Sequence, residues 1–182
     1  MSNIYFVRHG QSVWNIENKI CGATDVPLTE EGHRQAIETG ENILAQGIKV
    51  DEILCSPLSR AADTAKHIGE IIGVPVRVEP RLIEQNFGTF ESTPRKSPEF
   101  AAAKRQHATH YGGGESAFQV VQRIYNLLDD LKKESLETGK TYMLVAHNGL
   151  ARVINSYFYD MDNEEYADFG VKNCAVVKYE FD

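Results

Sequence analysis

The sequence has no long apolar run. None of its apolar stretches approaches the roughly 20 residues that a membrane-spanning helix needs, although 42% of the 182 residues are hydrophobic. The first residues, Met1-Ser2-Asn3, lack the basic and apolar segments of a secretory signal. We therefore expect a soluble, cytoplasmic protein with no membrane partner.

Cysteine is scarce and its spacing is irregular. The three cysteines, Cys21, Cys55 and Cys174, are an odd number without a Cys-x-x-Cys pair. This pattern argues against a disulfide framework and against a thiolate zinc site. Cys55 and Cys174 lie within apolar runs, so both are predicted to be small buried side chains.

Basic residues are in the minority. The chain has 19 Lys and Arg against 26 Asp and Glu, for a formal net charge of −7. Nucleic acids and anionic membranes need a basic face, so we expect no nucleic-acid partner. A small anionic ligand remains compatible where positive groups gather locally. The length suits one well-buried core, and residues 1–182 are predicted to form a single domain.

Strand-like and helix-like segments alternate along the chain. Short apolar segments predict strands at 3–7, 51–55, 76–78, 141–146 and 174–181. Periodicity predicts helices at about 30–46, 59–72, 116–136 and 149–158, the third with an apolar stripe that includes Phe118. This alternation predicts an α/β fold, a three-layer sandwich with a mostly parallel central sheet and helices on both faces. The irregular segment at about 88–115, with a short helix over 97–107, is predicted to be a cap-like insertion over the active site.

Charged and polar residues follow four of the predicted strands. In an open α/β sheet, ligands bind beyond the carboxyl ends of the strands. These ends carry Arg8-His9-Gly10, Ser56 to Arg60, Arg81 to Glu84, and His147-Asn148-Gly149. Two histidines, two or three arginines and one carboxylate are therefore expected at one edge of the sheet. The set predicts an anion site with acid and base groups.

This combination of residue types suits phosphoryl transfer. Arginine and a helix N-terminus favour a phosphate, and a neutral imidazole is a competent nucleophile toward phosphorus. Glu84 could protonate the leaving oxygen and then activate water. Gly10 is expected to leave space for the phosphate beside the backbone. We expect no metal and no cofactor, because two arginines and a histidine already neutralise the phosphoryl group.

The same residues resemble the histidine phosphatases, the phosphoglycerate mutase-like superfamily. Its motifs appear in order over most of the chain, as Arg8-His9-Gly10 with Gln11-Ser12 and Asn15, Cys21 to Gly32, Ser56 to Ala65, Leu82 to Gly88, Gly114-Glu115-Ser116, and Val145 to Gly149. The sequence departs from the family at Glu91-Ser92, where many members have Glu-Gly. The segment 92–113 is shorter than the insertion of typical glycolytic mutases, which favours a phosphatase.

The resemblance implies a role for each matched residue. His9 would be the phosphorylated nucleophile and Glu84 the proton donor, while the phosphate would be held by Arg8, Arg60 and His147. Further contacts to the substrate would come from Asn15, the backbone of Asn148, Cys21 and Gly22. The implied activity is a metal-independent phosphomonoesterase that hydrolyses a small phosphorylated metabolite.

Several alternatives stay open at this stage. Glu79 and Glu91 are rival proton donors, and His107 with His110 could pair on a metal, although an exposed helical face is favoured. His33 and His67 are interpreted as structural or exposed. The basic cluster Arg95, Lys96, Lys104 and Arg105 is either a solvated surface or a site for a second anionic group of the substrate. A mutase-type phosphotransferase and a non-catalytic phospho-ligand binding protein are the competing functions, and the oligomeric state is open.

Overall fold

The computed structural model describes residues 2–181, which contain a five-stranded sheet of order β3-β2-β4-β1-β5. Its strands are β1 (Ser2–Arg8), β2 (Glu52–Cys55), β3 (Val76–Val78), β4 (Tyr142–Ala146) and β5 (Val176–Phe181). The pairs β1–β4, β2–β4 and β2–β3 are parallel, whereas β5 runs antiparallel to β1. The predicted mostly parallel sheet is confirmed.

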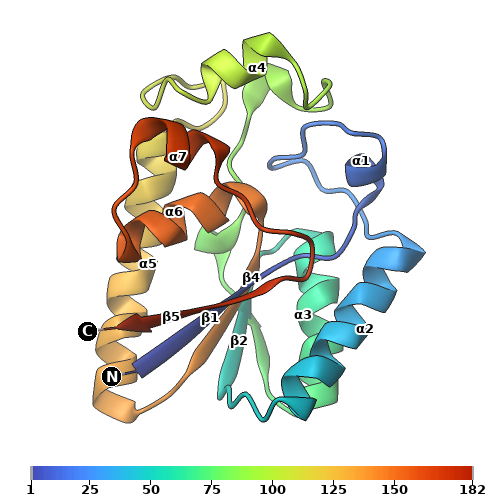
Figure 1. Ribbon diagram of the computed structural model, residues 1–182, viewed down its shortest axis with the longest axis vertical. Helices are drawn as coiled ribbons and strands as arrows, with labels where there is room; N and C mark the ends of the chain where they lie inside the picture. Colours follow the sequence, from blue (N-terminus) through green and yellow to red (C-terminus); the bar gives the residue numbers. More distant parts are fainter. Residues whose placement is uncertain (1, 182) are drawn as a thin grey trace.

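The central strand β4 is apolar throughout because both of its faces are covered. All five of its residues are buried, as expected for a parallel strand between two helical layers. Helices α2 (Glu30–Ala45) and α3 (Ser59–Ile72) cover one face, and α5 (Ala117–Thr138) and α6 (Asn148–Phe158) cover the other (Figure 1). The three-layer α/β arrangement is therefore as predicted.

Local signals in the sequence set the helix ends. Thr29 caps α2 by accepting a hydrogen bond from the Gly32 N–H at 3.0 Å, as the sequence predicts. Ser116 and Gln119 form a capping box at the start of α5. These caps fix the first residue of each helix, and so the point at which the preceding loop joins it.

The predicted apolar stripe of α5 is wrong at its first position. Phe118 is 63% exposed, while Val120, Ile124 and Leu127 are buried. The buried stripe of α5 passes through Val120, Ile124, Leu127 and Leu131. Phe118 precedes Val120 by two residues, which places it about 200° around the helix, on the outer face.

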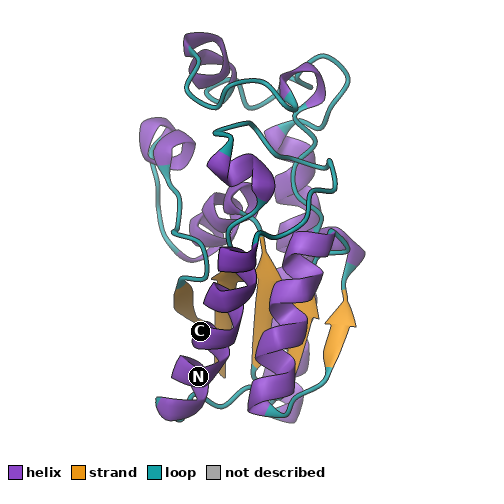
Figure 2. Cartoon of the chain, turned by 90° about the vertical axis from the view of Figure 1, so that its right-hand side faces the viewer, coloured by secondary structure: helices purple, strands orange, loops and turns teal. Residues whose placement is uncertain are grey.

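The segment at 88–115 stands above the carboxyl ends of the strands (Figures 1 and 2). Its helix α4 (Pro98–Ala103) is shorter than the predicted 97–107. The chain leaves the α-helix there because the N–H groups of Arg105 and Gln106 bond the carbonyls three residues earlier. A small hydrophobic cluster fixes the insertion to the loop below, and it comprises Ile20, Phe87, Phe100 and Tyr111.

Four short elements lie outside the sequence prediction, the helices α1 (Val13–Ile16) and α7 (Asn163–Asp168) and the 3-10 turns η1 (Pro80–Leu82) and η2 (Gly88–Phe90). The last strand begins at Val176, two residues after its predicted start at Cys174. Cys174 lies in the preceding turn with a φ of 58° and is half-buried, whereas Cys55 is buried as predicted. Within residues 2–181, no helix is both long and apolar enough to cross a membrane.

Candidate active site

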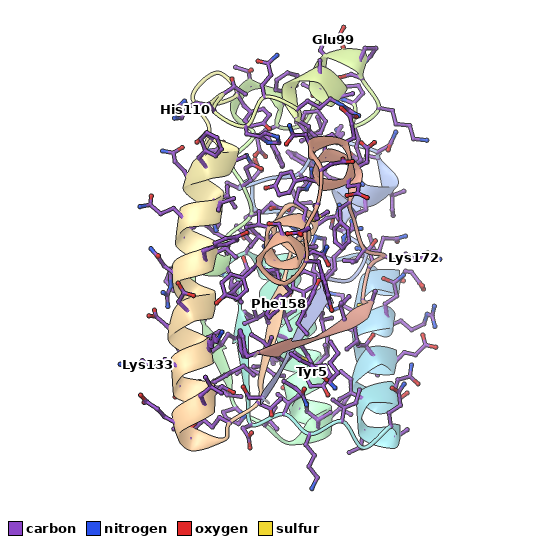
Figure 3. The ribbon with its side chains drawn as sticks, turned by 60° about the vertical axis from the view of Figure 1, so that its left-hand side comes forward. Tyr5, Glu99, His110, Lys133, Phe158 and Lys172 are labelled. Carbon is purple, nitrogen blue, oxygen red and sulfur yellow. The ribbon has the colours of Figure 1, made fainter. Side chains whose placement is uncertain are left out.

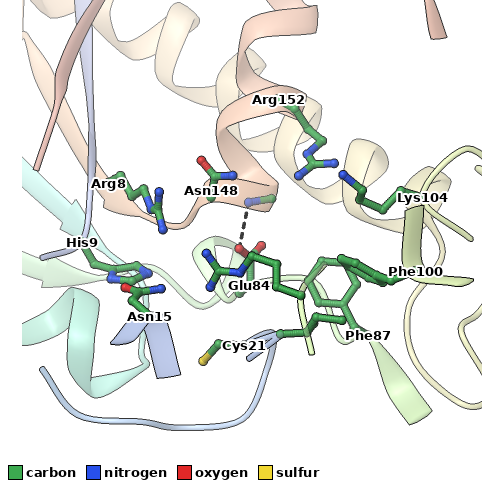
Figure 4. A pocket seen from close by; sticks show the side chains of 13 residues that line it. Arg8, His9, Asn15, Cys21, Glu84, Phe87, Phe100, Lys104, Asn148 and Arg152 are labelled. Atoms are coloured by element: carbon green, nitrogen blue, oxygen red, sulfur yellow. Dashed lines mark hydrogen bonds between the residues drawn. The ribbon is translucent and has the colours of Figure 1, made fainter. Parts of the chain in front are cut away.

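The strand ends bring the predicted polar residues to one cavity of about 130 Å³ (Figure 4). Arg8 and His9 come from the end of β1, Glu84 follows the turn after β3, and Asn148 begins α6 after β4. The predicted site residues among those that line the cavity are Arg8, His9, Asn15, Cys21, Glu84 and Asn148. The convergence inferred from the strand ends is therefore present in the structure.

His9 is held in one tautomer and kept neutral. Its Nδ1 lies 2.7 Å from the carbonyl oxygen of Gly10. A carbonyl only accepts, so Nδ1 carries the hydrogen and Nε2 keeps a lone pair. Burial, with the positive charges of Arg60 and Arg8, lowers the pKa of His9 well below its usual value. The ring is therefore a neutral base with one free nitrogen.

Glu84 lies between η1 and the N-terminus of α6. Its carboxylate oxygens accept hydrogen bonds from the backbone N–H groups of Gln85 at 2.9 Å and Gly149 at 2.8 Å. The carboxyl group is buried, and this burial raises its pKa above the usual value despite the two N–H donors. Such a group can hold a proton in the pH range where an exposed glutamate has lost it.

Arg60 and His147 lie behind the cavity wall. Both are fully buried, and neither lines the cavity. Arg60 donates to the carbonyls of Gly22 at 2.7 Å and Thr24 at 2.9 Å, so it holds the loop that carries Cys21. Gly22 follows Cys21 in this loop but does not line the cavity.

The His147 ring lies next to His9, with the two ring centroids 5.2 Å apart. Its Nε2 is 2.7 Å from the Ser56 hydroxyl. Burial lowers the pKa of His147 well below its usual value, so this ring is also neutral. The two imidazoles can lie this close because neither carries a charge.

Three buried nitrogens among these groups have no hydrogen-bond partner within residues 2–181: Nε of Arg8, Nε of Arg60 and Nδ1 of His147. Unpartnered buried polar atoms are rare in proteins. Arg8 remains cationic, although burial lowers its pKa to about 10. The unused nitrogens all belong to groups that suit a phosphate.

The two asparagines of the cavity wall are oriented through their oxygens. Oδ1 of Asn15 accepts from the Ser12 N–H at 3.0 Å and from Asn173 at 3.3 Å. Oδ1 of Asn148 accepts from the Val171 N–H at 2.9 Å. Each amide therefore offers its NH₂ group, a donor, to a ligand in the cavity.

The rival carboxylates have other partners. The Glu79 carboxylate accepts two hydrogen bonds from the Arg81 guanidinium, at 2.9 and 3.0 Å. This contact, together with Asp130, draws Arg81 away from the cavity. Glu91 accepts from the N–H groups of Gly22, Ala23 and Phe87, each at 3.0 Å. Neither glutamate lines the cavity. Arg81, the third arginine expected from the strand ends, does not line it either.

The expected role of Gly10 is wrong. A Cβ atom at this position would lie 2.4 Å from the carbonyl oxygen of Gly32. Glycine is therefore required because the end of β1 packs directly against the first turn of α2. The space it leaves is filled by protein backbone.

The basic cluster divides into two parts. Arg95 and Lys104 line the cavity, whereas Lys96 is exposed and Arg105 pairs with Glu164 and Asp168 of α7. Sequence reasoning missed Arg152, which also lines the cavity. Its position, one helical turn after Asn148, was the available signal. It also missed the apolar wall of Ile20, Phe87 and Phe100, which depends on the fold of the insertion.

The other four histidines, His33, His67, His107 and His110, do not line the cavity. The side chains of His33 and His67 contact each other across α2 and α3, with Nδ1 2.9 Å from Nε2. The His107 ring packs against Tyr166, while His110 is exposed and points outward (Figure 3). Within residues 2–181, no three His, Cys, Asp or Glu side chains are grouped to hold a metal ion.

Comparisons with known proteins give the family. A sequence model described as "Histidine phosphatase superfamily (branch 1)" matches residues 4–182. The probable phosphoglycerate mutase GpmB of Yersinia enterocolitica is 31% identical over 188 residues, covering 100% of this chain and 86% of that protein.

Solved structures of phosphatases have the same fold. Mycobacterial glucosyl-3-phosphoglycerate phosphatase is 28% identical with a TM-score of 0.83, covering 97% of this chain and 89% of that one. A mutant phosphoserine phosphatase of Entamoeba histolytica in complex with phosphoserine is 27% identical with a TM-score of 0.84, covering 100% of this chain and 92% of that one. Since the family match extends from β1 to the last strand, the chain belongs to the histidine phosphatase superfamily, branch 1.

Proposed function

We propose that this protein is a metal-independent phosphomonoesterase that hydrolyses a small phosphorylated metabolite through a phosphohistidine on His9. One observation carries the proposal. The neutral imidazole of His9 and the Glu84 carboxyl group, whose pKa is raised, line the same cavity. A nucleophile and an acid are thus present together, and the pKa of each is shifted in the direction that its role needs.

In the first step, Nε2 of His9 attacks phosphorus and the bond from phosphorus to the ester oxygen breaks. Glu84 gives its proton to that oxygen, so the alcohol leaves neutral. The negative charge of the transferring group is balanced by Arg8 in the cavity and by Arg60 behind its wall. The unpartnered Nδ1 of His147, also behind the wall, is the further donor. Fixed donors of this kind are usually the largest contribution to catalysis.

In the second step, the Glu84 carboxylate takes a proton from water, and the water oxygen attacks phosphorus. The bond from phosphorus to Nε2 breaks and inorganic phosphate is released. His9 returns to its neutral form and Glu84 to its protonated form. The hydrogen bond from Nδ1 of His9 to the Gly10 carbonyl keeps the same nitrogen in place for each cycle.

The relatives support both a hydrolase and a phosphotransferase. Two of the solved structures are phosphatases for glucosyl-3-phosphoglycerate and phosphoserine, which favours hydrolysis. The relatives named as probable phosphoglycerate mutases favour the second candidate, a phosphotransferase that returns the phosphate to its substrate. The two differ only in whether water or the substrate accepts the phosphoryl group from His9.

The test is phosphate release from sugar phosphates, phosphoglycerates and phosphoamino acids in the presence of a chelator. His9→Ala is expected to abolish release. His33→Ala is the matched control, because His33 contacts His67 outside the cavity, and it should keep wild-type rates. Isomerised phosphoglycerate without free phosphate would indicate the mutase. Binding of these compounds without any turnover would indicate a non-catalytic protein.

A further inference from the structure

Two histidines outside the cavity face each other across α2 and α3. Nδ1 of His33 lies 2.9 Å from Nε2 of His67. The ring planes are nearly perpendicular, at 88°, and the ring centroids are 5.2 Å apart. Neither ring lines the catalytic cavity, and the chemistry assigned to His9 and Glu84 uses neither. The phosphoryl chemistry therefore does not explain this pair.

The helices that carry the two rings pack closely against each other. α2 and α3 lie side by side on the same face of the sheet (Figure 1). Gly40 permits the close approach, because a Cβ atom there would lie 2.9 Å from Cδ1 of Ile71 and 3.3 Å from Cα of Ile68. His33 is two turns before Gly40 on the same face of α2, and His67 directly precedes Ile68. Packing thus fixes the backbone positions of the pair.

The two facing nitrogens can both offer a lone pair. They are too close for each to carry a hydrogen, so one of them donates and the other accepts. Each imidazole has a second nitrogen, and the hydrogen of the donor ring can move there while the ring stays neutral. The two inner nitrogens are then both acceptors. Neutral imidazole nitrogens in this state are the commonest metal ligands of proteins.

The distance between the nitrogens indicates the geometry of the ion that they can share. Imidazole nitrogens bind a divalent ion such as Zn²⁺ at about 2.0–2.1 Å. Two such nitrogens lie about 2.9 Å apart at a right angle and about 3.3 Å apart at a tetrahedral angle. The observed 2.9 Å therefore fits neighbouring positions of a square-planar or octahedral ion, the geometry of Cu²⁺ and Ni²⁺. A rotation of both rings directs their lone pairs to one point.

The surroundings of the pair are open and acidic. Both histidines are half-exposed, so an ion can enter and keep water as its other ligands. The charged residues three or four positions from either histidine are Glu30, Asp63 and Glu70, and such positions share a helix face. None of them is a third ligand, because no three His, Cys, Asp or Glu side chains within residues 2–181 are grouped around one point. They attract a cation without binding it directly.

We propose that His33 and His67 bind one divalent transition-metal ion, Cu²⁺ or Ni²⁺, between α2 and α3. The ion joins two helices that support the active site, since Arg60 lies in the first turn of α3 and Gly32 in the first turn of α2. It stabilises the fold and takes no part in the phosphoryl step. Because the pair lies outside the cavity, the inference does not rest on the proposed function.

The test is calorimetric titration of the tag-free full chain with NiCl₂. We expect one ion per chain, weaker binding of Zn²⁺, which prefers a tetrahedral site, and no binding of Mg²⁺, which prefers oxygen ligands. At a free concentration about 100-fold above Kd, Ni²⁺ should raise the Tm by about 5–10 °C. With Cu²⁺, electron paramagnetic resonance should show couplings to two imidazole nitrogens. Zn²⁺ bound as tightly as Ni²⁺ would contradict the right-angle geometry.

Variants assign the ion to this pair. His33→Gln and His67→Gln each remove one ligand and keep a polar side chain, and each should weaken Ni²⁺ binding by about tenfold or more and remove the shift in Tm. His110→Gln changes an exposed histidine of the insertion and should keep the wild-type affinity. His9→Gln tests the rival pair in the active site, His9 and His147, whose ring centroids are also 5.2 Å apart, and it should keep that affinity too.

Three results would overturn the inference. They are no binding of Ni²⁺ or Cu²⁺ to the wild type, wild-type affinity in both His33→Gln and His67→Gln, and loss of binding in His9→Gln or His110→Gln. The paramagnetic spectrum of the wild type decides the case if a variant fails to fold, since a single imidazole coupling would also reject the pair. Phosphate release in the presence of a chelator should be equal in His33→Gln and the wild type, so the metal site and the proposed function can fail separately.

Discussion

The carboxylate of Glu84 rests on the first turn of α6 at Gly149. Its Oε2 accepts the Gly149 N–H at 2.8 Å, and a Cβ atom at position 149 would lie 2.4 Å from Oε1. The N–H favours the charged carboxylate, whereas burial favours the neutral acid and prevails. These opposing effects suit a group that must give up a proton and take it back in each cycle.

Gly149→Ala is expected to lower kcat because the added methyl group pushes the Glu84 carboxyl group out of place. We expect a decrease of about tenfold to a hundredfold for an alkyl phosphate, part of the 10²–10⁴ that general acid catalysis contributes. Affinity for inorganic phosphate, measured by calorimetry, should change less. Gly139→Ala is the control, since no atom lies within 4 Å of that added Cβ and only the φ of 75° is unfavourable. Equal kcat values for Gly149→Ala and the wild type would contradict the positioning role.

The contact between Glu84 and Gly149 also marks the limit of what the sequence could predict. The order of strands and helices placed Glu84 and Gly149 at the same edge of the sheet, because parallel strands end on the same side. Their contact depends on the η1 turn, whose three residues carry no periodic signal. The sequence thus predicted that Glu84 and Gly149 lie at the same edge of the sheet, and the type of chemistry there. The η1 turn determines which of their atoms are in contact.

The cations Lys104 and Arg152 were predicted only in part, because the basic cluster of the sequence includes Lys104 but not Arg152. Lys104 follows α4, whereas Arg152 and Ala167 lie in α6 and α7. The three residues meet only after the insertion has folded over the sheet. In contrast, β4 and α3 were predicted within one residue, because a five-residue buried strand and the Gly73 cap are local signals.

Glu84→Gln is expected to reduce kcat according to the leaving group. An alkyl phosphate needs a proton on its leaving oxygen, so we expect a decrease of about 10²–10⁴. p-Nitrophenolate leaves without one, and its formation should fall much less in the first turnover, measured by rapid mixing. Glu79→Gln tests the rival acid. Glu79 pairs with Arg81 outside the cavity, so this variant should keep the wild-type dependence on the leaving group.

The pH dependence of kcat/KM should have two limbs. His9 attacks only when neutral, and its pKa lies well below the usual value of 6.5, so activity rises with pH on the acid side of 6.5. Glu84 acts only when protonated, and its pKa is raised above 4.5, so activity falls as pH rises through that raised value. Glu84→Gln is expected to remove the falling limb. The ionisation of the substrate contributes equally to both proteins. A falling limb that persists in the variant at a pH other than the pKa of the substrate would therefore assign the acid to another group.

Glu91→Ala is expected to raise KM more than it lowers kcat. Its carboxylate accepts from the N–H groups of Gly22 and Ala23 at 3.0 Å and from the Thr24 hydroxyl at 2.8 Å. It therefore holds the loop that places Cys21 on the cavity wall. Loss of these charge-assisted bonds should raise KM by about tenfold. Glu99→Ala changes an exposed carboxylate of α4 and serves as the control. A decrease confined to kcat would instead place Glu91 in the chemistry.

Arg60→Lys tests whether the forked guanidinium of Arg60 also serves the phosphate. The guanidinium of Arg60 reaches two carbonyls, Gly22 and Thr24, at 2.7 and 2.9 Å, and an ammonium group cannot match this forked geometry. We expect the free energy of unfolding to fall by about 1.5–3 kcal/mol and kcat/KM to fall by about 10²–10³, measured by urea unfolding and by phosphate release. Arg77→Lys changes a half-exposed arginine paired with Glu52 and should alter stability by no more than about 0.5 kcal/mol. If Arg60→Lys loses stability and keeps the wild-type kcat/KM, the forked geometry of Arg60 serves only the loop, and catalysis needs no more than its positive charge.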